Sequence, residues 1–275
     1  MSNILESTFI PTTTNFIHQG TGTPVILIHG LAASLHDWDD LIPSLVQNGY
    51  AAYAPDLLGH GDSPKLDSLT YQMDWVFEHF FQWMRSLRLT EPAILIGHSL
   101  GGHVGLEYAR RASAWTRGLI LVNPFYSPSQ LPLLIRKTYG RANLSGALLS
   151  KTPEWLFRFL VDMSSAAIGH SVGALHSLPE RVRTQTVLDY KRTAPGVYHI
   201  PHAIDDMTRH LHEINTPALV LWGDRDKTLA TSSFTRLVNA LPKARGEILP
   251  AGHVPHQSHA EEFNQIVLKF LKELQ

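Results

Sequence analysis

The feature that most constrains the fold is a regular alternation of short apolar runs with segments of helical spacing. Continuous apolar runs are typical of strands buried on both faces, and their alternation with helices predicts an α/β fold: a mainly parallel twisted sheet covered by helices on both sides. One or two edge strands are expected within residues 8–20, and Thr70 is expected to cap the second helix. The expected strands are 24–28, 51–55, 93–96, 119–122, 218–222 and 246–249, and the expected helices are 38–47, 71–87, 232–241, 261–274 and one beginning near Leu100.

The alternation stops at Asn123-Pro124 and resumes only after about residue 210. The intervening stretch has helical but irregular spacing, contains aromatic residues such as Trp155, and shows no good strand. We therefore expect a helical cap at 124–210, inserted between the two parts of one core domain, 1–123 and 211–275. A chain of 275 residues is long enough for one sizeable domain with such an insertion.

The composition excludes several classes of function. The chain has no cysteine, which rules out thiol catalysis, disulfides and thiolate metal sites. Its net charge of −1 offers no electrostatic footprint for nucleic acid or an anionic membrane. No apolar run is long enough to span a bilayer, and the first residues lack the basic region and apolar core of a secretion signal. We expect a soluble, cytoplasmic protein, and the sequence carries no signal for its oligomeric state.

A candidate nucleophile stands where the run 93–96 meets the following helix. The segment Gly97-His98-Ser99-Leu100-Gly101 reads as strand, tight turn and helix, with a serine at the apex. Glycines on both sides permit the strained backbone that lifts the hydroxyl clear of the sheet. A second G-x-S-x-G pattern occurs at 169–173 around Ser171, but the residues before it are small and mixed and do not form a bounded strand. Ser99 is therefore the predicted nucleophile.

A serine needs a base, and the base needs an acid that orients it. Both should follow later strands, because open sheets place their sites beyond the carboxyl ends of the strands. The run 218–222 leads into Gly223-Asp224-Arg225-Asp226, so either aspartate could be the acid. The run 246–249 leads to His253, whereas His256 and His259 lie further on and could merely flank the last helix.

These pieces together resemble the α/β-hydrolase family, from about Pro24 to the C-terminus. The matching segments are His29-Gly30, 56–63, the turn at Ser99, 223–226 and Gly252-His253. The resemblance implies that Asp226, the last position of G-x-x-D, is the acid and that His253 is the base. It also implies that the backbone N–H groups of Leu31 and Leu100 stabilise the oxyanion. Some family members carry the acid after the preceding strand, but Asn123 at that position lacks the charge. His29 and Trp155 are candidates for substrate contact.

Other polar residues have simpler interpretations. His253, His256 and His259 could suggest zinc, but no H-E-x-x-H motif occurs, so we expect no metal. The glycines at 20–22 precede their strand, whereas a dinucleotide-binding loop follows one, so we expect no cofactor. His60 and His98 are expected to be structural or to line the pocket, and Asp56 to order its loop.

The expected activity is hydrolysis of small apolar carboxylic esters by a Ser-His-Asp triad through an acyl-enzyme. Activity should fall as the pH drops through about 6–7, where histidine ordinarily becomes protonated. The serine argues against the relatives that use aspartate as nucleophile. A carbon–carbon bond hydrolase of aromatic ring-cleavage products is the main alternative, and lactonase, thioesterase and perhydrolase activities stay open. A ligand receptor built on the same fold is the alternative that is not an enzyme.

Overall fold

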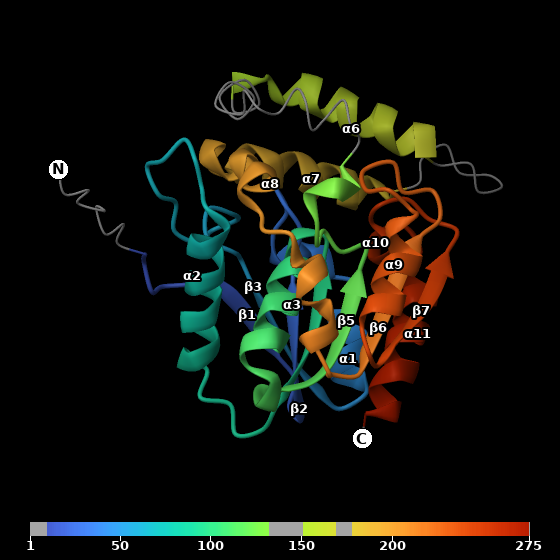
Figure 1. Ribbon diagram of the computed structural model, residues 1–275. Coiled ribbons are helices and arrows are strands. Elements are labelled where there is room, and N and C mark those ends of the chain that lie inside the picture. The colour runs from blue at the N-terminus through green and yellow to red at the C-terminus, as the bar shows by residue number, and fades with distance from the viewer. Residues whose placement is uncertain (1–9, 132–150, 169–177, 275) are drawn as a thin grey trace.

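A seven-stranded sheet forms the centre of the molecule in a computed structural model that describes residues 10–131, 151–168 and 178–274 (Figure 1). The strand order is β1-β3-β2-β4-β5-β6-β7, and only β1 runs antiparallel to its neighbour. All six runs expected to be strands are present, so the predicted fold class is confirmed. The strands are β1 (Phe16–Gln19), β2 (Thr23–Ile28), β3 (Tyr50–Pro55), β4 (Ala93–His98), β5 (Thr116–Val122), β6 (Ala218–Gly223) and β7 (Ala244–Leu249).

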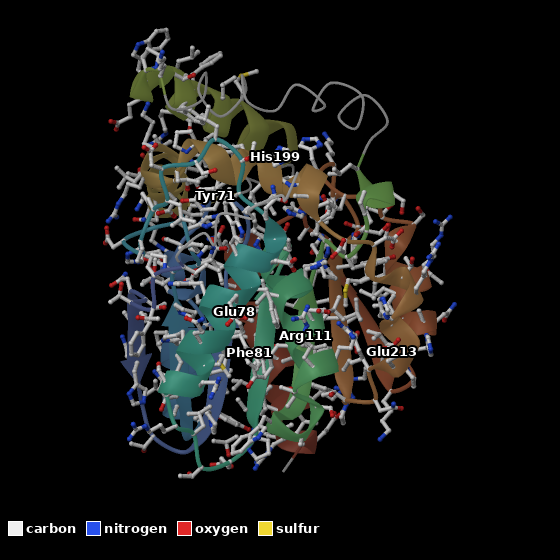
Figure 2. The ribbon with its side chains drawn as sticks, turned by 60° about the vertical axis from the view of Figure 1, so that its left-hand side comes forward. Tyr71, Glu78, Phe81, Arg111, His199 and Glu213 are labelled. Carbon is white, nitrogen blue, oxygen red and sulfur yellow. The ribbon has the colours of Figure 1, made fainter. Side chains whose placement is uncertain are left out.

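Helices cover both faces of the sheet, and each face has its own apolar core. Successive residues of a strand point to opposite faces: Val25 of β2 belongs to one core and Ile26 to the other, and both are fully buried. One core includes residues of α2 (Met73–Ser86), α3 (Leu100–Arg111) and α9 (Ser233–Ala240), and the other includes residues of α1 (Ile42–Gln47) and α11 (Ala260–Glu273). Figure 2 turns the first face forward, with Phe81 on α2 and Arg111 on α3. Burial of each large apolar side chain contributes about 1.5–3 kcal/mol.

Several boundaries differ from the sequence prediction, among them the starts of two helices. The helix expected at 38–47 is instead a short 3₁₀ helix, Leu35–Trp38, followed by α1, which has Pro43 in its first turn, where the missing proline N–H costs no hydrogen bond. The second helix begins at Met73 with Gln72 as its cap residue, so the prediction of a Thr70 cap was wrong. The reason is tertiary: the Tyr71 amide donates to the Gly196 carbonyl, which holds the preceding residues outside the helix.

Between β5 and β6 the described residues are helical or irregular. Helices α6 (Glu154–Ile168), α7 (Glu180–Arg192) and α8 (Ile200–Ala203) lie above the carboxyl ends of the strands (Figure 1). Ion pairs join α7 to core loops: Arg181 contacts Asp40 at 2.5 Å, and Arg192 contacts Asp62. We propose 124–210 as the bounds of this cap. In the part of the chain that the structure describes, no helix has the length and apolar character needed to cross a membrane.

Candidate active site

Ser99 lies at a strained turn between β4 and α3. Its backbone angles, φ 50° and ψ −111°, are rarely adopted by residues other than glycine. The two flanking glycines are required by close approach of the backbone. A Cβ on Gly97 would lie 2.3 Å from the Gly101 carbonyl oxygen, and one on Gly101 would lie 2.1 Å from that of Ile28. The strain therefore persists because the surrounding strands and helix hold the turn in place.

Asp226 follows β6 and is surrounded by hydrogen-bond donors. Its Oδ1 accepts from the backbone amides of Thr228 and Leu229 at 2.7 and 3.0 Å, and its Oδ2 accepts from Asn123 Nδ2 at 2.7 Å. Burial would raise the pKa of Asp226, but the charge and hydrogen bond of His253, together with the Leu229 and Asn123 bonds, hold it below its usual value. The carboxylate is therefore ionised at neutral pH.

His253 joins the serine to the carboxylate. Its Nδ1 lies 2.8 Å from Asp226 Oδ2, and its Nε2 lies 3.0 Å from Ser99 Oγ. These distances are within the range for proton transfer along hydrogen bonds. The His253 carbonyl oxygen accepts a hydrogen bond from His98 Nε2 at 3.0 Å, which ties the histidine loop to the residue before Ser99. The structure thus brings together the three residues predicted as a triad.

The competing candidates lie elsewhere. The Asp224 side chain is half exposed beside Arg225, 3.8 Å away. His259 Nδ1 is hydrogen-bonded to Ser258 Oγ. Asn123 occupies the position where some family members carry the acid, and the sequence indicated no role for it. In the structure it donates to Asp226 and accepts from the Gly223 amide, so it helps to position the carboxylate. The second G-x-S-x-G pattern at 169–173 lies outside the described residues.

Two backbone amides are free to face a reacting carbonyl. Among the described residues, neither the Leu31 nor the Leu100 amide donates a hydrogen bond to another group. Leu100 is the first residue of α3, where the helix dipole adds positive character. Ala32 follows Leu31 with φ 56°, so the loop after β2 also has left-handed backbone.

The two predicted substrate-contacting residues do not line the cavity at Ser99. His29 is fully buried: its Nε2 accepts from the Leu57 amide and its Nδ1 donates to the Gly30 carbonyl, so both nitrogens hold loops in place. Trp155 is 71% exposed on α6. Neither residue is among the described residues that line this cavity, so the cavity lends no support to the prediction that they contact substrate.

A cavity of about 220 Å³ opens at Ser99 and His253. Its apolar lining comes from Leu31, Ala32, Ala33, Val182 and Val254. Helix α7 adds several polar residues to the lining, which were not predicted from the sequence. Nothing in the local sequence pattern indicates which face of that helix is turned towards a site. These polar residues are Gln185, Thr186, Asp189 and Tyr190.

Behind the serine lies a buried polar cluster of Asp37, His98 and His256, whose ligand-competent atoms all lie within 4.8 Å of one another. Asp37 accepts from the Gly30 amide at 3.3 Å and from Gln257 Nε2 at 3.1 Å, and His98 Nδ1 lies 3.4 Å from its Oδ2. Burial would raise the pKa of Asp37, but the neighbouring histidines lower it to about 2. This carboxylate therefore joins the loop after β2, the serine turn and the histidine loop.

Asp56 and His60 have structural roles, as the sequence suggested. Asp56 accepts from the Leu35 and Asp62 amides and so orders the loop after β3. His60 is fully buried, and burial lowers its pKa to about 3, so it is neutral.

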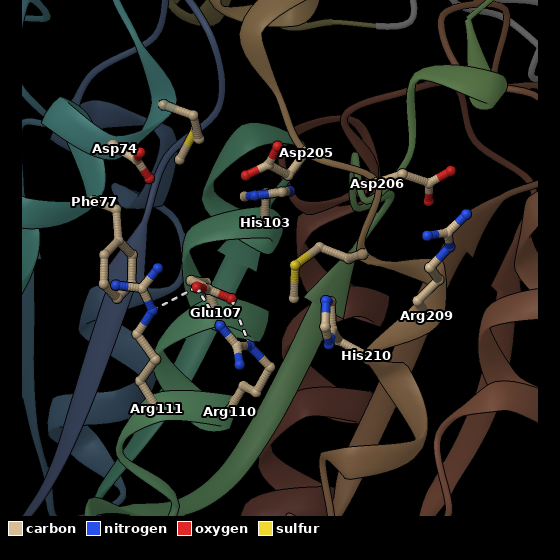
Figure 3. A pocket seen from close by; sticks show the side chains of 12 residues that line it. Asp74, Phe77, His103, Glu107, Arg110, Arg111, Asp205, Asp206, Arg209 and His210 are labelled. Atoms are coloured by element: carbon tan, nitrogen blue, oxygen red, sulfur yellow. Dashed lines mark hydrogen bonds and ion pairs between the residues drawn. The ribbon is translucent and has the colours of Figure 1, made fainter.

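A second cavity, of about 410 Å³, lies between α2, α3 and the segment 205–210 (Figure 3). In it, Arg110 and Arg111 both contact Glu107, at 2.8 and 2.5 Å. None of its lining residues belongs to the cavity at Ser99, so we do not include it in the candidate active site.

Comparison with known proteins identifies the fold family. Residues 23–260 match the model of the alpha/beta hydrolase fold. The chain is 24% identical over 266 residues to the 2-hydroxy-6-oxo-6-(2'-aminophenyl)hexa-2,4-dienoic acid hydrolase of Metapseudomonas resinovorans, covering 94% of this chain and 87% of that one. It is 27% identical to Lipase 3 of a Moraxella species, over 86% of this chain and 73% of the lipase. A thermophilic esterase from Thermogutta terrifontis superposes with a TM-score of 0.78 at 21% identity, over 95% and 93% of the two chains.

Proposed function

The chain belongs to the alpha/beta hydrolase fold family, and from that premise we propose that it is a serine hydrolase of carboxylic esters. The observation that carries the proposal is the continuous contact from Ser99 Oγ through His253 to Asp226, at 3.0 and 2.8 Å. A strained serine with free amides beside it is the arrangement that acyl transfer requires.

The proposed mechanism assigns each group one task. His253 Nε2 takes the Ser99 proton as the oxygen attacks the ester carbonyl, while Asp226 holds the opposite nitrogen and stabilises the imidazolium. The Leu31 and Leu100 amides donate to the oxyanion. The imidazolium protonates the departing alcohol, which leaves an acyl-enzyme. His253 then deprotonates water, which attacks the acyl carbon and releases the acid, and the proton returns to Ser99.

The lining of the cavity favours an ester over the carbon–carbon hydrolase alternative. The Metapseudomonas relative is named for a dienoic acid, a substrate with a carboxylate. Among the described residues that line the cavity at Ser99 there is no lysine or arginine to pair with such a group, and Asp189 is present instead. The apolar lining and the small volume suit a short apolar acyl group.

The decisive experiment is hydrolysis of p-nitrophenyl esters of increasing acyl length by the wild type, Ser99→Ala and Ser171→Ala. We expect turnover that is greatest for short chains, is abolished in Ser99→Ala and is retained in Ser171→Ala. Retained turnover in Ser99→Ala would refute the proposal. Stoichiometric labelling of Ser99 without turnover would instead indicate a receptor. Ring-cleavage products, lactones and thioesters tested alongside would identify the alternative hydrolase activities.

A further inference from the structure

Asp189 is a carboxyl group of the cap that lines the same cavity as Ser99. It lies on α7 and is only 3% exposed, although aspartate is seldom buried without a charged partner. The described residues that line this cavity include a second carboxylate, Asp37, and neither lysine nor arginine. The cavity therefore has acidic groups with no permanent positive charge of its own to balance them.

The contacts of Asp189 leave its charge uncompensated. Gln185 Nε2, one turn earlier on α7, donates to its Oδ1 at 2.9 Å. From the core, the segment 34–38 faces it with Ser34, His36 and Asp37. Burial raises the pKa of Asp189 to about 7, the hydrogen bonds of Gln185 and Ser34 lower it, the Asp37 charge raises it, and His36 lowers it. An amide and a hydroxyl stabilise the carboxylate less than a cation would.

We propose that Asp189 is a specificity residue that selects esters carrying a positively charged ammonium group. The inference rests on the proposed function, because it places this group beside the ester that Ser99 attacks. The structure provides the carboxyl and the space, and the substrate provides the missing positive charge.

Three kinds of substrate meet Asp189 differently. An anionic substrate is repelled by Asp189 and Asp37. A neutral apolar ester fits the apolar part of the lining but gives the buried carboxyl no charged partner, so it gains nothing from Asp189. An ammonium group pairs with the carboxylate in a site shielded from water, where such a pair is stronger than at a surface. Discrimination therefore favours the cation.

The test uses substrate pairs that differ only in charge. The first pair is butyrylcholine and its carbon isostere, in which a tert-butyl group replaces trimethylammonium. The second pair places the same exchange at the end of the acyl chain of a p-nitrophenyl ester. The first pair is followed by pH-stat titration and the second by absorbance. For at least one pair we expect kcat/KM to be on the order of tenfold higher for the cation in the wild type.

Variants separate the charge of Asp189 from its shape. Asp189→Asn keeps the size of the side chain and should reduce the cation preference to about twofold or less. Glu180→Gln is the matched control, because Glu180 is an exposed acid on the same helix and does not line the cavity. It should keep the wild-type preference. Circular dichroism and denaturant unfolding check that both variants fold.

The preference should also depend on pH. Protonation removes the Asp189 charge, so the ratio between cation and isostere should decline as the pH is lowered through about 7. A pH effect on the chemical step at Ser99 is common to both substrates and cancels in the ratio. The ratio in Asp189→Asn should be flat with pH.

Each outcome decides between the two proposals. Suppose that hydrolysis depends on Ser99. The specificity inference then fails, and the hydrolase proposal stands, if neither substrate pair shows a cation preference or if Asp189→Asn keeps that preference. If hydrolysis does not depend on Ser99, calorimetric binding of choline to Ser99→Ala still tests the inference. Choline binding to Ser99→Ala that is lost in the double variant Ser99→Ala/Asp189→Asn supports the specificity inference. Equal binding to the two variants, or no binding to either variant, overturns it.

Discussion

Replacing Asp226 by asparagine tests the candidate triad most directly. The carboxylate receives four donors: Thr228 and Leu229 amides on Oδ1, and Asn123 Nδ2 and His253 Nδ1 on Oδ2. An amide has one acceptor oxygen. The backbone amides of Thr228 and Leu229 cannot turn away, so the amide oxygen should face them, and its NH₂ group should face Asn123 and His253.

The magnitude follows from this count. One buried donor, Asn123 Nδ2, loses its acceptor, while His253 can change its tautomer, so the free energy of unfolding should fall by about 1–3 kcal/mol. His253 then accepts at Nδ1 and carries its proton on Nε2, where it can no longer take the proton of Ser99. In the serine-protease triad this tautomer change lowers kcat by about 10⁴, and we expect a loss of about 10³–10⁴ here.

Ester hydrolysis and urea unfolding measure the two effects separately. Asp224→Asn is the control, because it removes an acid two residues away whose side chain is half exposed and does not contact His253. It should leave kcat within about twofold and stability within about 0.5 kcal/mol. If Asp226→Asn kept kcat within tenfold of the wild type, or if both variants lost activity equally, the assignment of Asp226 would be refuted.

Two further predictions concern the framework. Gly101→Ala should reduce the unfolding free energy by more than about 2 kcal/mol, because its Cβ would lie 2.1 Å from the Ile28 carbonyl oxygen. Gly105→Ala is the control: its Cβ would come no closer than 3.3 Å, to Leu119 Cδ1, and should change the unfolding free energy by no more than about 1 kcal/mol. Equal shifts of the urea midpoint in the two variants would contradict this. Asp37→Asn should cost about 2 kcal/mol at neutral pH, since the pKa of Asp37 falls from 3.8 to about 2 on folding. A carboxyl whose pKa is lowered by folding stabilises the folded state at pH values above its unfolded pKa. The loss of stability in Asp37→Asn should therefore shrink as the pH falls from about 4 towards 2, and a loss that stays constant with pH would contradict this.

Much of the fold could be predicted because its signals are local. The apolar runs of β2 and β4 are continuous, and Gly97 and Gly101 bracket Ser99 within five residues, so the strand–turn–helix unit can be recognised without any tertiary contact. That Ser99, Asp226 and His253 come together follows from the way parallel strands end at one edge of the sheet, because each residue follows such a strand.

The features that the sequence did not predict depend on contacts between residues distant in sequence. Thr70 does not cap α2, because the Tyr71 amide donates to the carbonyl of Gly196, which is far along the chain. Asn123 supports Asp226 across 103 residues. No local pattern contains that partnership.

The sequence by itself determined the sheet, the strained serine turn and the residue types that follow β6 and β7, because periodicity and glycine placement act over a few residues. Only the tertiary structure decided which side chains face the cavity. It turned His29 inward to hold loops, left Trp155 in solvent, and placed Asp189 of α7 in the cavity at Ser99. The physical reason is that the rotation and docking of a helix depend on all the surfaces it packs against, which no short stretch of sequence specifies.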